Sequence, residues 1–249
     1  MCKIGNCYQN GLGIERNLDN VNPFIYYQKS ADMELVDGIF GVGVCYERGV
    51  GVKKDEQKGF MNYKKAADMG HIVGTNNVGY CYERGIGVEE NKHKAFIYYQ
   101  KSANMGFVSG IYNVGVCYER GIGVEMDEDK AFIYFKKSAD MGGVYGINNV
   151  GYCYENGIGV EIDEDKAFIY YKKSADMGYA IAIKNVGYCY ENGIGVDIDE
   201  HKAFTYYQKS ADMGHAIAIK KVGDCYLYGI GVDQDEYKAF TYHKKLAEM

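Results

Sequence analysis

The sequence lacks any apolar run close to the about 20 residues that a membrane-spanning helix needs, and its opening MCKIGNCYQN is not a signal peptide. Positive charge is also in deficit. Asp and Glu number 34 against 28 Lys and Arg, which gives a net charge of −6 and a pI near 5.5. Because neutralising phosphates requires a basic face, this balance argues against a nucleic-acid partner. These absences predict a soluble, cytoplasmic chain without a membrane span.

Motifs of metal, nucleotide and catalytic sites are missing as well. The acidic segments EMDEDK and EIDEDK lack the D-x-[DN]-x-[DN]-G spacing of a calcium loop, and the GIG turns lack the full G-x-G-x-x-G of a dinucleotide fingerprint. The histidines never recur beside a serine or cysteine, so we interpret them as isolated surface residues. They are His71, His93, His201, His215 and His243. We therefore expect no catalytic residue, metal, cofactor or small-molecule substrate.

What the sequence has instead is a repeated string. NVGYCYENGIGV stands at 149–160 and 185–196, and close variants stand at 41–52, 77–88, 113–124 and 221–232. The cysteines of these strings are separated by 36 positions, whereas Cys7 precedes Cys45 by 38, which places an insertion in the segment ERNLDNVN of the first repeat. A catalytic centre is not normally copied six times in one chain, so the string indicates a repeat array.

The equally spaced cysteines argue against disulfides. Equivalent cysteines would sit on stacked helices about 8–10 Å apart, whereas a disulfide needs Cα atoms within about 7 Å. One thiol per repeat also cannot gather the four ligands of a zinc site. We expect buried thiols that pack as small apolar residues, which favours a reducing compartment.

Each repeat divides into two predicted helices joined by a turn. In residues 180–215 the first helix covers AIAIKNVGYCYEN, with Ala182, Val186, Cys189 and Tyr190 on its apolar face. Gly187 recurs inside this helix in each repeat, and we interpret it as a close approach of another helix that leaves no room for a Cβ. Of the turn residues, Gly193 is a predicted left-handed cap, Gly195 reverses the chain, and Ile194 and Val196 plug the helix ends.

The second helix is predicted to begin after a capping residue, Asp199, and to end at Gly214. Ala203, Tyr206 and Tyr207, with Ser210 or Ala211, are its predicted buried stripe. The equivalent caps are Asp55, Asn91, Asp127, Asp163 and Asp235. The first repeat carries the only proline, Pro23, in the first turn of a helix that we expect Asn22 to cap.

The pattern A-x-A-x-x-x-[LV]-G-x-x-Y-x-x-G-x-G-V-x-x-D-x-x-K-A-x-x-[WY]-Y-x-K-x-A-x-x-G resembles the Sel1-like repeat, a relative of the tetratricopeptide repeat. Here it reads AIAIKNVGYCYENGIGVDIDEHKAFTYYQKSADMG and extends over essentially the whole chain. Tyrosine replaces the usual tryptophan, and Gly59 and Asn62 depart from the pattern in the second repeat. We expect one array over 1–249, with repeats at about 1–35, 36–71, 72–107, 108–143, 144–179, 180–215 and 216–249, the first of them truncated.

The resemblance implies an all-α fold, an α/α right-handed superhelical solenoid whose first helices line the concave side. It also implies a non-catalytic scaffold or adaptor that binds a partner protein or peptide on that side. Two alternatives stay open. One is a β-lactamase-like hydrolase of the Helicobacter cysteine-rich type, although that branch carries two cysteines per repeat and this chain carries one. The other is the regulatory repeat region of a longer, kinase-linked signalling protein.

Positions 2, 6, 9 and 13 of each first helix share a face distinct from the apolar stripe, and we call these side chains the strip. They are Val73, Asn77, Tyr80 and Arg84; Ser109, Asn113, Val116 and Arg120; Tyr145, Asn149, Tyr152 and Asn156; and Ile181, Asn185, Tyr188 and Asn192. Asparagine can donate to and accept from a peptide backbone, and tyrosine offers contact area at little entropic cost, so the strip suits peptide capture. The alternative is that each asparagine bonds the neighbouring repeat. A binding role is favoured more strongly for the variable residues Phe40, Tyr112, Lys184, Asp224 and Tyr228.

Overall fold

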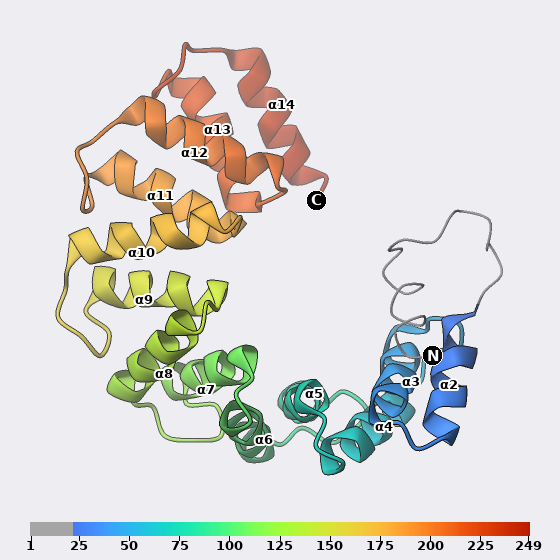
Figure 1. Ribbon diagram of the computed structural model, residues 1–249. Helices are drawn as coiled ribbons and strands as arrows, with labels where there is room; N and C mark the ends of the chain where they lie inside the picture. Colours follow the sequence, from blue (N-terminus) through green and yellow to red (C-terminus); the bar gives the residue numbers. More distant parts are fainter. Residues whose placement is uncertain (1–21) are drawn as a thin grey trace. The chain divides into compact units, whose positions relative to one another are not determined.

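The computed structural model of the chain describes residues 22–249 (Figure 1). This part contains thirteen α-helices and no β-strand. Cys7 and nearly all of the predicted insertion in the first repeat lie outside the described residues. The predicted all-α repeat fold is confirmed.

The helices fall into two compact units, which we call unit 1, ending at Met126, and unit 2, Asp127–Met249. Unit 1 contains α2 (Pro23–Asp32), α3 (Val36–Arg48), α4 (Glu56–Asp68), α5 (Ile72–Arg84), α6 (Lys92–Asn104) and α7 (Val108–Arg120). Unit 2 contains α8 (Glu128–Asp140), α9 (Val144–Asn156), α10 (Glu164–Asp176), α11 (Ala180–Asn192), α12 (Glu200–Asp212), α13 (Ala216–Tyr228) and α14 (Glu236–Ala247).

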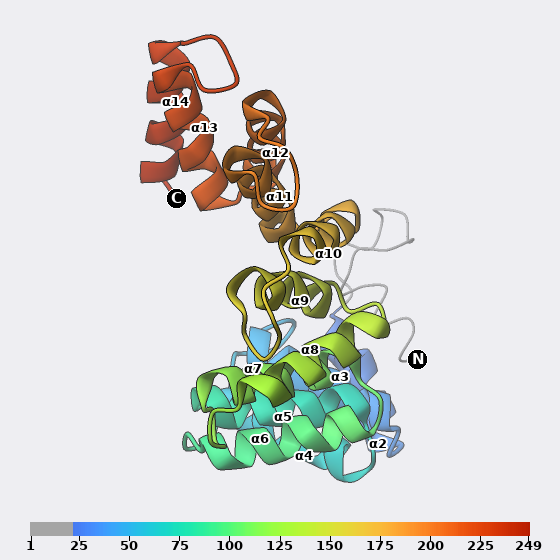
Figure 2. The same ribbon diagram turned by 90° about the vertical axis from the view of Figure 1, so that its left-hand side faces the viewer.

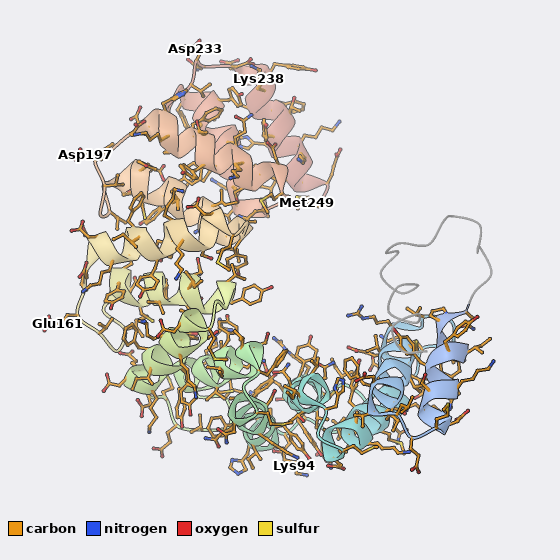
Figure 3. All side chains as sticks on the ribbon, in the orientation of Figure 1. Lys94, Glu161, Asp197, Asp233, Lys238 and Met249 are labelled. Atoms are coloured by element: carbon orange, nitrogen blue, oxygen red, sulfur yellow. The ribbon has the colours of Figure 1, made fainter. Side chains whose placement is uncertain are left out.

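Within each unit, helices that follow one another in the chain pack together. In unit 2, α9 packs on α10, α11 on α12 and α13 on α14, and each of these pairs is one repeat (Figure 2). The contacts of α10 with α11 and of α12 with α13 join one repeat to the next. The loops between first and second helices follow one another along one edge of unit 2, at the labelled residues Glu161, Asp197 and Asp233 (Figure 3).

The helix boundaries follow local sequence signals. The backbone N–H of Lys202 donates to the Asp199 carboxylate at 2.9 Å, so Asp199 caps α12 as predicted, and the other five predicted caps accept the same bond. Asn22 accepts from the N–H of Phe24, and α2 begins at Pro23. At the other end of a first helix, Gly193 ends α11 in the left-handed conformation with φ +74°.

The core of a repeat is formed by small residues of the first helix and a tyrosine of the second. Ala182, Val186 and Cys189 are buried as predicted, and Ile183 joins them. The predicted stripe of α12 is wrong at one position, because Tyr206 is only half-buried while Phe204 is 7% exposed. Phe204 turns inward because its ring packs edge-to-face on the Tyr226 ring at 5.3 Å.

Gly187 marks a close contact between the two helices of one repeat. A Cβ at this position would lie 2.9 Å from two carbons of the Tyr207 ring. Gly79 and Gly151 meet the rings of Tyr99 and Tyr171 in the same way. The predicted close approach is therefore confirmed, and its partner is an aromatic ring.

The second glycine of the turn makes a contact that the sequence did not predict. A Cβ on Gly195 would lie 2.1 Å from the carbonyl oxygen of Glu164, the first residue of α10 in the preceding repeat. Gly195 also has φ +62°. Since a Cβ is excluded on both grounds, the GIGV turn is a reversal of the chain and a joint between repeats.

The described cysteines are thiols buried in the helix interfaces, between 0% and 4% exposed. Burial raises the pKa of the Cys45 thiol to about 11 and that of the Cys117 thiol to about 12. These thiols are protonated at neutral pH, so they serve as packing groups.

Candidate functional site

The strip lies on the side of each first helix that faces away from the core. Its tyrosines at position 9 of α5, α9 and α11 are exposed, with Tyr80 44%, Tyr152 43% and Tyr188 38% exposed. Tyr145 and Ile181, at position 2, are 47% and 37% exposed. In α9 and α11, which belong to successive repeats, the strip therefore presents aromatic and apolar area at the same positions.

The asparagines at position 6 connect neighbouring repeats. In unit 2 the Asn185 side-chain N–H donates to Asn148 at 2.9 Å, and in unit 1 Asn113 donates to Asn76 at 2.9 Å. Both bonds run from position 6 of one repeat to position 5 of the repeat before it. These bonds correspond to the alternative that each asparagine bonds the neighbouring repeat. Each bond uses one N–H of the donating amide, which leaves its second N–H and its carbonyl oxygen.

Three of the other predicted asparagines bond within their own helices. Asn149 accepts from Asn148 at 3.3 Å. At position 13, Asn156 and Asn192 donate to the backbone carbonyl oxygens one turn earlier, at 2.9 Å and 2.8 Å. They thereby satisfy carbonyl groups at the C-terminal ends of their helices.

Arginine replaces asparagine at position 13 in unit 1. Arg84 lies 3.6 Å from Glu83 and Arg120 lies 3.3 Å from Glu119, with both arginine side chains more than 60% exposed. Exposed pairs of this kind contribute little to stability, so either guanidinium can turn towards a partner at small cost.

Beneath the strip lies a row of glutamates that the sequence analysis missed. The Tyr99 hydroxyl donates to Glu83 at 2.7 Å and the Tyr207 hydroxyl donates to Glu191 at 2.6 Å. Tyr63 with Glu47, and Tyr171 with Glu155, form the same bond. Burial and then the glutamate raise the pKa of each phenol, so the phenols stay protonated and hold the carboxylates in place. The recurrence of Glu and Tyr at a constant spacing was the available signal.

The variable residues have unlike environments. Phe40 stacks on the His71 ring, with centroids 4.3 Å apart. Asp224 pairs with Lys220 at 2.7 Å and with His243 at 3.1 Å, and Tyr228 is 69% exposed. Tyr112 and Lys184 are both half-buried on their helices.

The interpretation of the histidines as isolated surface residues is wrong. His71 and His215 cap α5 and α13, because their ring Nδ1 atoms accept backbone N–H groups at 2.9 Å and 3.3 Å. His93 and His201 bond the carbonyl oxygens of Gly123 and Gly231. His243 replaces the core tyrosine of the last repeat and pairs with Asp224. An imidazole can cap a helix as an acceptor, which the usual preference for Ser, Thr, Asp and Asn conceals.

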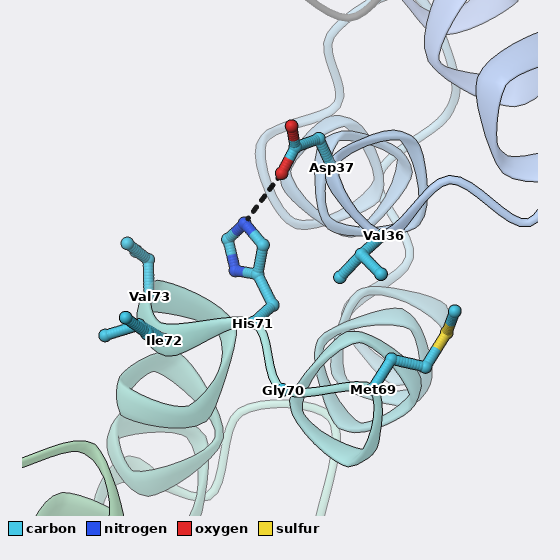
Figure 4. Close-up of a pocket in the computed structure, with 7 residues that line it drawn as sticks. All are labelled: Val36, Asp37, Met69, Gly70, His71, Ile72 and Val73. Atoms are coloured by element: carbon cyan, nitrogen blue, oxygen red, sulfur yellow. Dashed lines mark ion pairs between the residues drawn. The ribbon is translucent and has the colours of Figure 1, made fainter. Parts of the chain in front are cut away.

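His71 also borders a hollow of about 400 Å³ in unit 1 (Figure 4). The His71 Nε2 lies 3.5 Å from the Asp37 carboxylate, which is 74% exposed. The other lining residues in the described part of the chain are Val36, Met69, Gly70, Ile72 and Val73. None of these side chains is a nucleophile that the histidine could activate, so we interpret the pair as part of the helix cap.

We expect His71 to make stability depend on pH. Burial, opposed by Asp37, lowers the His71 pKa below its ordinary value, since the fold requires a neutral Nδ1. As the pH falls through about 6.5, the unfolded chain takes up this proton first and the folded state loses stability, until the pH drops below the folded pKa. His71→Asn keeps a capping side chain without titrating. The advantage of the wild type over His71→Asn in urea unfolding should shrink from pH 7.5 to pH 5, and pH-independent differences would contradict the assignment.

Within residues 22–249, no three His, Cys, Asp or Glu side chains are placed to hold a metal ion. No helix in that range combines the length and apolar character needed to cross a membrane.

Comparison with known proteins places this geometry in a family. The model of the Sel1 repeat matches residues 1–35, 36–71, 73–107, 108–143, 144–179, 180–215 and 216–249. A Sel1 repeat protein from Oxalobacter formigenes is 27% identical, with a TM-score of 0.88 over 100% of this chain and 99% of that one. A protective antigen with an SLR fold from uropathogenic Escherichia coli is 29% identical, with a TM-score of 0.79, and the chain covers 49% of its length. An immunity protein from Pseudomonas aeruginosa, 21% identical with a TM-score of 0.60 over 86% of this chain and 81% of that one, shares the fold. No curated protein matches the chain.

Proposed function

Since the chain belongs to the Sel1 repeat family, whose members are generally protein-interaction scaffolds, we propose that it binds an extended segment of a partner protein along the strip. The observation that carries this proposal is the exposed tyrosine at position 9 of α5 and of two successive first helices in unit 2, α9 and α11. Tyrosine supplies contact area with only two side-chain torsions to fix, which is why it dominates many protein-binding surfaces.

The dimensions support an extended ligand. Neighbouring packed helices lie about 8–10 Å apart, and an extended chain advances about 3.3 Å per residue, so about three ligand residues pass each repeat. The first helices of unit 2 would thus contact about nine residues. The asparagines at position 6 of α9 and α11, Asn149 and Asn185, then meet the ligand backbone with amide groups that their bonds to Asn148 leave unused.

We propose a non-catalytic role for the array, with its seven repeats acting together. The described thiols are buried and protonated, so they are poor nucleophiles, and the strip combines phenols and amides without a general base beside a nucleophile. The buried thiols also support a reducing compartment, such as the cytoplasm, as the place of action. Turnover of a penicillin analogue that disappears on a single substitution would contradict this role.

A displayed library of random peptides of about twelve residues, selected on the intact chain, provides a ligand for the test. We expect Tyr152→Ala with Tyr188→Ala to weaken the tightest selected peptide about 100-fold, since each buried aromatic contact contributes about 1–2 kcal/mol or more. Fluorescence anisotropy measures the Kd.

The matched control removes apolar area from the second helices of the same unit. Ile133→Ala with Ile169→Ala deletes side chains that are 59% and 60% exposed on α8 and α10. This double variant should bind the peptide as the wild type does. Equal losses in both double variants, or a library that yields no peptide, would contradict the proposed surface.

A further inference from the structure

The side chains at positions 5 and 6 of adjacent repeats are of a different type at the end of unit 2. Asn148 and Asn185 form it between α9 and α11. In the next pair of repeats, Lys184 of α11 and Lys221 of α13 occupy the same two positions. Two cations thus stand where the preceding joint has two amides.

Lys221 is neutralised within the chain. Its Nζ lies 2.9 Å and 2.7 Å from the two carboxylate oxygens of Glu191, and 5.5 Å from the centre of the Tyr207 ring. Glu191 also accepts a hydrogen bond from the Tyr207 hydroxyl. Lys221, Glu191 and Tyr207 therefore form a hydrogen-bonded network in which the charges of Lys221 and Glu191 balance.

Lys184 has no such partner. In residues 22–249, no carboxylate lies within ion-pair distance of its Nζ, although the side chain is half-buried. Burial lowers the Lys184 pKa most, the Glu155 carboxylate opposes this, and the Lys221 ammonium lowers the pKa further. A half-buried ammonium without a counter-ion is unfavourable, and an arriving anion would relieve it.

The surroundings of Lys184 define which anion fits. Tyr188 is exposed one turn along the same face of α11, beside Asn185, so an extended segment crossing the strip passes this ammonium. The carboxylate of Glu155 of α9 acts electrostatically on Lys184 and would repel a doubly charged phosphate more than a singly charged carboxylate. Unit 2 also has no arginine, the residue that suits bidentate phosphate recognition.

We propose that Lys184 is a subsite for a carboxylate of the bound segment, supplied by an aspartate or glutamate side chain. The subsite rests on the proposed function, because the segment must lie along the strip to reach it. The subsite also fixes how the bound segment is aligned along the strip. The acidic residue of the partner lies over α11 and α13, and its neutral residues lie over α9.

The peptide library tests the subsite. Peptides selected on the wild-type chain should share an acidic residue at one position, and Lys184→Met should weaken the tightest of them about tenfold, as expected for a lost charge-assisted bond. Lys184→Gln should give the same loss, which separates the charge from any repacking by methionine. The Kd for the wild type should rise with salt more steeply than the Kd for either variant.

Lys173→Met is the matched control, since Lys173 is exposed on the second helix α10 of the same unit. We expect it to leave the Kd unchanged. A selection repeated on Lys184→Glu should replace the acidic residue of the peptides with a basic one at the same position.

The outcomes separate the two proposals. If the variant with Tyr152→Ala and Tyr188→Ala loses binding while Lys184→Met does not, the peptide lies on the strip and the carboxylate subsite is wrong. If synthetic versions of the selected peptide that carry a phosphorylated or neutral residue in place of the acidic one bind with equal affinity, the subsite is also wrong. If neither set of substitutions weakens the peptide, the proposed function is itself contradicted.

Discussion

Gly195→Ala is expected to lower the free energy of unfolding by about 3 kcal/mol or more. The new Cβ would stand 2.1 Å from the carbonyl oxygen of Glu164, which belongs to a helix terminus and cannot move aside alone. Alanine at φ +62° adds about 1–2 kcal/mol of backbone strain, and the overlap adds about 1–3 kcal/mol. Urea unfolding followed by circular dichroism measures the loss.

Gly178→Ala isolates the backbone part of this effect. Gly178 has φ +85°, but a Cβ there would meet no atom within 4 Å. Its substitution should therefore cost only about 1–2 kcal/mol. Equal losses for the two variants would mean that the contact with Glu164 contributes nothing.

The position of the damage gives a second readout for Gly195→Ala. Contacts in a repeat array are made between nearest neighbours, so a disrupted joint weakens the adjoining repeats most. Amide hydrogen exchange should accelerate in α10 and α11 more than in α14, and uniform acceleration would contradict a local joint.

Tyr171→Ala should destabilise the chain by about 3–5 kcal/mol, the largest effect that we expect from a single core substitution. Tyr171 is 1% exposed, and its ring fills the space that Gly151 leaves open against α9. Removing the ring creates a cavity between two helices and deprives Glu155 of its phenol donor. Urea unfolding at neutral pH measures the change.

Tyr171→Phe separates these two losses, because it keeps the ring and removes only the hydroxyl. We expect a cost of about 1 kcal/mol, the usual net contribution of one hydrogen bond. The chain already accommodates phenylalanine at the equivalent position of another repeat, where Phe135 is fully buried. A loss as large as that of Tyr171→Ala would show that the hydroxyl, rather than packing, stabilises this position.

Features that depend on a few neighbouring residues were predictable from the sequence. The cap at Asp199, the left-handed Gly193 and the buried Cys189 each follow from local chemistry and from the helical period, so repetition made their assignment secure. The exposed tyrosines of the strip also lie on the predicted face.

Features that depend on which residues of different helices meet were not predictable in the same way. The Tyr207 hydroxyl meets Glu191 across the hairpin, and Lys184 takes the place of an asparagine at a joint between repeats. Hydrophobic periodicity fixes which face of a helix is buried, but not the stagger of one helix against the next. The capping role of His71 was missed because imidazole is not one of the residue types that the capping rules favour.

The contact of each turn glycine with the start of a helix in the preceding repeat constrains how such a gene can change length. Removing or duplicating one whole period returns the same glycine to the same carbonyl oxygen, so every joint is remade. Removing part of a period places a residue other than this glycine against that oxygen, where there is no room for its Cβ. Unequal recombination between the identical strings at 149–160 and 185–196 exchanges whole periods, so we expect its products to fold.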